Sequence, residues 1–194
     1  MSHAVTDLPR RHRLSVDDYR RMAEVGILAP DDRIELIDGE IIDMVPPGDL
    51  HIVTLMLLDR ALRVAEKDAF VLVQSPVRLS QFSQPQPDVA LLRLRDDSYH
   101  RHRLEPADVL LVVEVSDSSL RFDRDTKMRL YATHEIPEAW LVDVRGRRLI
   151  RHRAPREGAY TLVDEPNLGA ALEVSTLPGV TIDLRRLFDG APGA

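Results

Sequence analysis

The stretch from Pro87 to Lys127 decides the fold of this 194-residue chain. It contains two apolar runs, Pro87-Asp88-Val89-Ala90-Leu91-Leu92 and Leu110-Leu111-Val112-Val113-Glu114-Val115-Ser116, and then a polar segment that carries Lys127. Each run is typical of a buried strand, and each holds one carboxylate, Asp88 in the first and Glu114 in the second. A buried strand tolerates an acid only when its charge is compensated. Two acids and a lysine on neighbouring elements therefore predict a divalent-metal site.

Helical and strand patterns flank this stretch on both sides. Upstream, the sequence predicts a helix over 15–26, a β-hairpin over 33–44 with an Asp38-Gly39 turn, a helix over 50–67, and a strand over 70–74 that continues across Pro76 to Leu79. Downstream, it predicts a helix over 122–134, strands over 139–144, 149–153, 160–163 and 171–174, and a closing strand with a short helix over 181–188. This order predicts a mixed α/β fold.

The composition is that of an ordinary globular protein, with 44% hydrophobic and 30% charged residues. The length predicts one domain, over residues 14–190, after a flexible tail over residues 1–13. The chain has no cysteine, which excludes disulfides and cysteine-type zinc sites and fits a cytoplasmic location. Charges interrupt every apolar stretch, and the first residues lack a signal-peptide core, so we expect no membrane association.

The net charge of −6 argues against a protein that coats nucleic acid by neutralising its phosphates, although it does not exclude a nuclease. One basic run, Arg145–Arg156, contains six arginines and no acid. This run either follows a nucleic-acid backbone, pairs with the excess of acids in the chain, or lies at a subunit contact. The segment Tyr99–Arg103 either contacts phosphates or forms a solvated loop.

Several blocks of the sequence resemble the Uma2 family, a group of restriction-endonuclease-like proteins in the PD-(D/E)xK nuclease superfamily. The resemblance extends from about Leu14 to Val144 and onward towards Phe188. The blocks that carry it are Pro87-Asp88, Glu114 at the end of a Val-rich strand, Tyr131, Ile136–Asp143, Arg33–Ile41 and Asp117–Arg124. The resemblance implies a restriction-endonuclease-like mixed β-sheet core flanked by helices, with an N-terminal helix and β-hairpin and extra C-terminal strands.

The resemblance also implies a set of metal ligands and catalytic residues. Asp88 would be the bridging ligand of a Mg²⁺ or Mn²⁺ ion, Glu114 the second ligand, and the backbone carbonyl of Val115 a third. Glu35 corresponds to the upstream glutamate of the family, which would be a further ligand or a base for water. The hairpin pattern places Glu35 on the face opposite Ile34 and Leu36, towards a polar site.

The catalytic lysine departs from the superfamily pattern. That pattern places a lysine two residues after the glutamate, where this chain has Ser116. Lys127, on the next helix, is the expected substitute, because a lysine recurs in this helix in Uma2-like sequences and Lys67 is the other lysine in the chain. His51 opens a helix beside a Pro-Gly turn and either reaches the mouth of the site or, as we favour, is a surface histidine.

These observations predict a metal-dependent endonuclease that hydrolyses DNA phosphodiester bonds. The alternative is an inactive module that retains the nuclease fold and binds nucleic acid or protein, which Ser116 and the negative net charge favour. A third hypothesis is a metal-dependent phosphoesterase that acts on another substrate. Because one site cuts one strand at a time, a homodimer would suit cleavage of double-stranded DNA.

Overall fold

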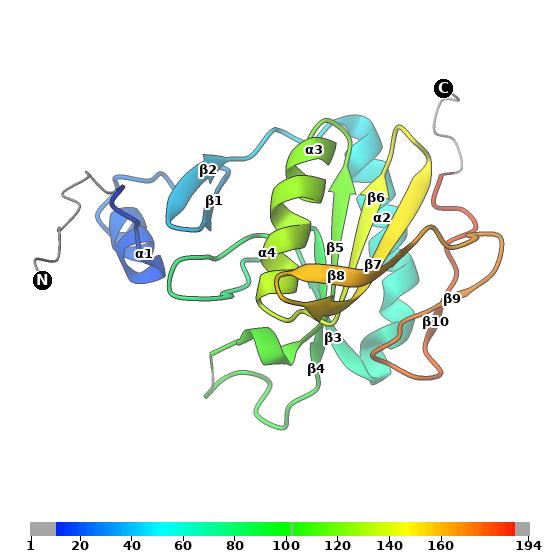
Figure 1. Cartoon of the computed structure of the whole chain (residues 1–194). Helices are drawn as coiled ribbons and strands as arrows, with labels where there is room; N and C mark the ends of the chain where they lie inside the picture. Colours follow the sequence, from blue (N-terminus) through cyan, green and yellow to red (C-terminus); the bar gives the residue numbers. More distant parts are fainter. Residues whose placement is uncertain (1–10, 102, 189–194) are drawn as a thin grey trace, which may run out of the picture.

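A computed structural model describes residues 11–101 and 103–188 of the chain (Figure 1). Most of the predicted tail, the predicted domain end at 190, and His102 therefore lie outside the described residues.

A six-stranded mixed sheet forms the centre of the molecule, in the order β3-β4-β5-β6-β7-β8 (Figure 1). Strands β5 and β6 are parallel, and every other neighbouring pair is antiparallel. The central strands β4, β5 and β6 are apolar and almost wholly buried, as expected for strands that are covered on both faces. The strands are β3 (Ala69–Val73), β4 (Val89–Arg93), β5 (Val109–Ser116), β6 (Glu138–Asp143), β7 (Arg148–Arg156) and β8 (Ala159–Asp164).

The parallel strands β5 and β6 cannot be joined by a tight turn, so a helical crossover connects them. This crossover covers one face of the sheet (Figure 1). It consists of α3 (Leu120–Phe122), a π-helical turn (Asp123–Lys127) and α4 (Met128–Thr133). The predicted helix over 122–134 is thus confirmed, but its first part is π-helical. A 3₁₀ turn (Pro106–Asp108) precedes β5.

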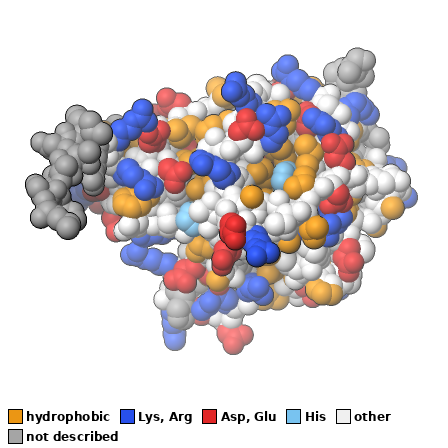
Figure 2. All heavy atoms as spheres, in the orientation of Figure 1, with side chains coloured by type: hydrophobic (Ala, Val, Ile, Leu, Met, Phe, Trp, Pro, Cys, Tyr) orange, Lys and Arg blue, Asp and Glu red, His pale blue; other side chains and the backbone are white. Residues whose placement is uncertain are grey.

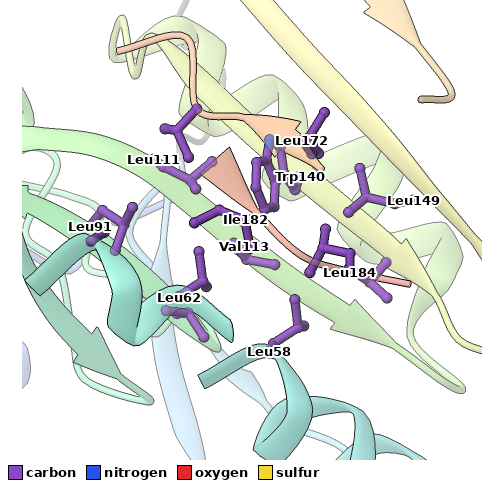
Figure 3. Packing of buried hydrophobic residues seen from close by; sticks show 14 of the residues in the cluster. Leu58, Leu62, Leu91, Leu111, Val113, Trp140, Leu149, Leu172, Ile182 and Leu184 are labelled. Atoms are coloured by element: carbon purple, nitrogen blue, oxygen red, sulfur yellow. The ribbon is translucent and has the colours of Figure 1, made fainter. Parts of the chain in front are cut away.

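The opposite face of the sheet packs against α2 (Asp49–Leu62) and the C-terminal segment (Figure 3). Leu58 and Leu62 of α2 lie against Val113 of β5, while Trp140 of β6 is fully buried among residues from both segments. A 3₁₀ turn (Arg63–Lys67) follows α2, so the predicted helix over 50–67 is largely confirmed. The C-terminal segment contains the short strands β9 (Leu172–Glu173) and β10 (Thr181–Ile182), which pair with each other.

The N-terminal unit consists of α1 (Val16–Glu24) and the hairpin of β1 (Ile34–Ile37) and β2 (Glu40–Asp43). Ser15 caps α1 through a reciprocal capping box with Asp18. Asp38 and Gly39 both have positive φ, as a two-residue hairpin turn requires. The backbone pairing of Leu36 with Gln84 attaches this hairpin to the segment that precedes β4.

The predicted continuation of β3 across Pro76 to Leu79 is wrong. Gln74 has a φ of +41°, which turns the chain out of the sheet, and its N–H donates to the carbonyl of Asp88. The N–H groups of Val77 and Leu79 then donate to the carbonyls of Pro85 and Ser83 instead of to a sheet strand. The segment therefore forms a loop of its own, which packs Val77 and Leu79 into the core.

The molecular surface carries mixed charge. Figure 2 shows acidic and basic side chains interspersed over the face that it draws. Among the described residues, no helix has the length and apolar character needed to cross a membrane.

Candidate active site

A pocket of about 620 Å³ opens where the β1–β2 hairpin, the start of α2, the end of β5 and the start of the crossover meet. The predicted site residues Glu35, Asp88, Glu114 and Lys127 all line this pocket. They come from four separate elements and are brought together only by the fold. Val115 also lines the pocket.

Asp88 is held in place by β5, the strand that carries Glu114. Asp88 immediately precedes β4, and the pairing of Val89 with Val113 puts it beside the end of β5. The Val115 N–H donates to Oδ2 of Asp88 at 2.8 Å, and the Gln74 side chain donates to Oδ1 at 3.2 Å. The carboxylate is therefore fixed by its neighbours, with Oδ1 directed towards the pocket side that His51 occupies.

Lys127 lies between the two glutamates. Its Nζ is 3.1 Å from Oε2 of Glu35 and 3.3 Å from Oε1 of Glu114. The three side chains are 4%, 2% and 3% exposed, so this is a buried cluster. The Tyr131 hydroxyl donates a short hydrogen bond to Glu114, and the backbone N–H of Gln86 donates to Glu35 at 3.1 Å. Both oxygens of Glu114 thus face a positive charge or a donor, whereas the Lys127 and Gln86 contacts of Glu35 share its Oε2.

One lysine shared by two buried carboxylates leaves a net negative charge in this cluster. Burial raises the pKa of Glu114 well above its ordinary value, although Lys127 opposes the rise. Burial alone would lower the pKa of Lys127, but the charges of Glu114 and Glu35 raise it overall. Burial, followed by the charge of Glu114, also raises the pKa of Tyr131. The cluster therefore favours an additional positive charge, either a proton or a cation.

Ser116, at the position of the superfamily lysine, has a structural role here. Its hydroxyl donates to Oδ2 of Asp123 at 2.6 Å, and the Ser119 hydroxyl donates to the same oxygen at 2.5 Å. These bonds tie the end of β5 to the start of the crossover. The following π-helical turn then directs Lys127 back over β5 to Glu114.

His51 belongs to the pocket, so its interpretation as a surface histidine is wrong. Its side chain is 14% exposed, and Nε2 lies 3.1 Å from Oδ1 of Asp88. Burial alone would lower the pKa of His51, but the adjacent Asp88 and the Val115 backbone raise it. The sequence held no clear signal for this position, which depends on the close approach of the α2 N-cap Gly48 to the Asp117 carboxylate, where a Cβ would lie 2.9 Å from Oδ2. A larger residue here would require the Asp117 side chain to shift.

The donor set around Asp88 fits a divalent cation. Nε2 of His51 is buried and has no hydrogen-bond partner of acceptable geometry among the described residues. A buried imidazole nitrogen that lies beside a carboxylate without a well-formed hydrogen bond is chemically suited to binding a cation. As the side chains stand, no three His, Asp or Glu residues in 11–101 and 103–188 converge on one point, since Lys127 fills the space between the two glutamates. Ligation by Asp88 and Glu114 together therefore needs side-chain movement.

A family model described as "Putative restriction endonuclease", Uma2, matches residues 16–185. The chain belongs to the Uma2 family. Its fold is also similar to a crystal structure of "a putative nuclease belonging to DUF820" from Anabaena variabilis, with a TM-score of 0.64 and 13% identity over 90% of this chain and 97% of the other. No curated protein matches the sequence. The predicted family and the predicted nuclease-like fold are therefore both confirmed.

The arginines of the basic run of the Uma2 chain are paired with acids. Arg145 bonds to Asp117, and Arg148 bonds to Asp143 and Glu165. On β7, the side chains of two further arginines converge on one carboxylate of β8, the pairs being Arg151–Asp164 and Arg153–Asp164. Of the three interpretations of Arg145–Arg156, pairing with acids is therefore the one that the structure supports.

Proposed function

We propose that this Uma2 protein is a metal-dependent endonuclease that hydrolyses DNA phosphodiester bonds with Mg²⁺ or Mn²⁺. The observation that carries the proposal is the position of Lys127, 3.1 Å from Glu35 and 3.3 Å from Glu114 in the pocket that holds Asp88. Two acids and a lysine thus meet although Ser116 replaces the motif lysine. The family description and the nuclease-like fold agree with this chemistry.

Each residue has a distinct proposed role. Asp88, Glu114 and the Val115 carbonyl would hold the cation, because all three present oxygen atoms, which Mg²⁺ and Mn²⁺ prefer. A bound divalent cation supplies Lewis-acid stabilisation of the phosphate and activation of a water nucleophile. Lys127 would place a compact positive charge where negative charge develops on the phosphate oxygens. Glu35 would accept the proton of the attacking water or act as an additional ligand.

The inactive-module alternative is less well supported. As a nucleic-acid binder, such a module needs a contact surface that works without metal, and the arginines expected to form that surface are engaged with acids. We therefore favour the enzyme, acting in the cytoplasm on DNA, with a homodimer as the form suited to cutting both strands.

A plasmid-nicking assay tests the proposal. We expect Mg²⁺- or Mn²⁺-dependent nicking by the wild type and its loss in Asp88→Ala and in Glu114→Gln, with far-UV circular dichroism confirming that each variant is folded. Asp183→Ala is the control, since Asp183 is an exposed acid that bonds to Arg185 on the C-terminal segment. Nicking that persists in both pocket variants would refute the assignment.

A further inference from the structure

His51 occupies a position from which it can act on the same ion as Asp88. It lies in the first turn of α2, a helix of 14 residues that begins immediately after Pro46-Pro47-Gly48. The close approach of Gly48 to Asp117 sets the start of this helix against the end of β5. The side chains of His51 and Asp88 are 14% and 11% exposed, so both face the pocket and not the solvent.

The geometry of the His51–Asp88 pair is not that of a simple hydrogen bond. Nε2 lies 3.1 Å from Oδ1, but the approach does not satisfy hydrogen-bond geometry, and Nε2 has no other partner among residues 11–101 and 103–188. A buried ring nitrogen without a well-formed hydrogen bond is unfavourable in the neutral imidazole, whereas a bound cation would satisfy both the nitrogen and the carboxylate beside it. The other oxygen of Asp88 is already bound by the Val115 N–H.

The distance between Nε2 of His51 and Oδ1 of Asp88 is also the distance expected between two ligands of one metal ion. Two adjacent ligands of an octahedral ion, each about 2.1 Å from it, are about 3.0 Å apart. The observed 3.1 Å between Nε2 and Oδ1 matches this spacing. The nearby Val115 carbonyl would add an oxygen, and water would complete the set, as it commonly does for small divalent ions.

We infer that Nε2 of His51 ligates the same divalent cation as Asp88 and gives the site a preference for first-row transition-metal ions over Mg²⁺. This inference rests on the proposed function, and it adds a ligand and a metal preference that the two carboxylates alone would not give. Oxygen ligands suit Mg²⁺ well, whereas an imidazole nitrogen strengthens binding along the series Mn²⁺, Fe²⁺, Co²⁺. The pocket would therefore bind Co²⁺ most tightly, Mn²⁺ next and Mg²⁺ least tightly among these three test ions.

The direct test is electron spin-echo spectroscopy of Mn²⁺ bound to the full chain. We expect ¹⁴N modulation from a directly bound nitrogen in the wild type, and we expect labelling with ¹⁵N-histidine to change it. Absence of a histidine nitrogen signal in the wild type would overturn the inference. Because this measurement uses the unaltered protein, it does not depend on the folding of any variant or on cleavage activity.

Calorimetric titration with Mn²⁺, Co²⁺ and Mg²⁺ provides the second measurement. Removing a ligand should cost at least about tenfold in affinity, so His51→Ala should weaken Co²⁺ and Mn²⁺ binding by about 10–100-fold and Mg²⁺ binding by much less. His12→Ala is the matched control, since His12 is exposed and does not line the pocket.

The two experiments separate failure of the inference from failure of the proposed function. If Asp88→Ala abolishes Mn²⁺ binding while His51→Ala binds all three ions like the wild type, His51 is not a ligand but the proposed metal site stands. If Asp88→Ala binds Mn²⁺ as tightly as the wild type, the metal site itself is wrong, and the inference about His51 is overturned with it.

Discussion

Replacing Lys127 by methionine should destabilise the protein strongly, and by an amount that depends on pH. Methionine keeps most of the side-chain volume but removes the charge that lies between the buried Glu35 and Glu114. Removing one partner from a buried ion pair typically costs about 3–5 kcal/mol, because the other charge remains buried without compensation. The variant has one way to limit this cost, which is to protonate a carboxylate.

Protonation of one carboxylate sets an upper bound on the loss of stability in Lys127→Met. For a carboxyl group with an ordinary pKa of 4.5, protonation at pH 7 costs about 3.4 kcal/mol, at about 1.36 kcal/mol per pH unit. We therefore expect a loss of about 3 kcal/mol at pH 7 and of about 1 kcal/mol at pH 5. Above pH 4.5 the folded variant holds one more proton than its unfolded state. Its free energy of unfolding therefore falls as the pH rises.

Urea unfolding at pH 5, 6 and 7, with a chelator present, measures this dependence. Lys67→Met is the matched control, since Lys67 is 76% exposed and its replacement should change the free energy of unfolding by less than about 0.5 kcal/mol. The double variant Lys127→Met/Glu35→Gln should recover much of the loss, because one of the two buried charges is then absent. A loss in Lys127→Met below about 1 kcal/mol at pH 7, or one that is independent of pH, would refute this account of the cluster.

Three further predictions concern the rest of the fold. Glu138 on β6 is fully buried and accepts hydrogen bonds from the backbone N–H and the hydroxyl of Ser175, so Glu138→Ala should cost about 2–4 kcal/mol in urea unfolding by releasing the C-terminal segment. Burial lowers the pKa of His152, so the unfolded state binds more protons than the folded state just below pH 6.5. The free energy of unfolding therefore rises with pH in this range. His152→Gln should flatten this rise in thermal melts between pH 5 and 7. Gly39→Ala should lower the melting temperature more than Gly179→Ala in the same melts. Both glycines have φ near +80°, but only at Gly39 would a Cβ lie 2.6 Å from a neighbouring side chain. Equal decreases in melting temperature would show that backbone strain dominates.

The residues that could be predicted from the sequence are those whose position follows from strand geometry. Asp88 and Glu114 line the same pocket because they lie at opposite ends of two apolar runs that pair in antiparallel register. Glu35 lies in the pocket because strand alternation places it opposite the buried Leu36. These placements need only local periodicity and one pairing.

The features that escaped prediction depend on contacts between distant parts of the chain. The left-handed conformation of Gln74, which ends β3, is stabilised by a bond to the Asp88 carbonyl. The burial of His51 depends on how closely α2 approaches β5, which periodicity does not report. The pairing of Arg151 with Asp164 follows from the β7–β8 register, so here the sequence held a usable signal once those strands were taken as a hairpin.

The π-helical turn also has a consequence for how such proteins are recognised. In a straight α-helix, residues four apart are rotated by about 40° past a full turn, so Asp123, Lys127 and Tyr131 would spread over about 80°. The wider turn, in which the Met128 N–H bonds to the carbonyl of Asp123 five residues back, offsets part of this rotation and keeps the three side chains over the end of β5. Loss of one residue from this turn would swing the lysine away from the glutamates, an effect that no substitution reproduces. A motif search that requires a lysine at a fixed number of residues after the glutamate therefore misses such chains. A search that also accepts a lysine on the crossover helix that follows the glutamate strand would detect them.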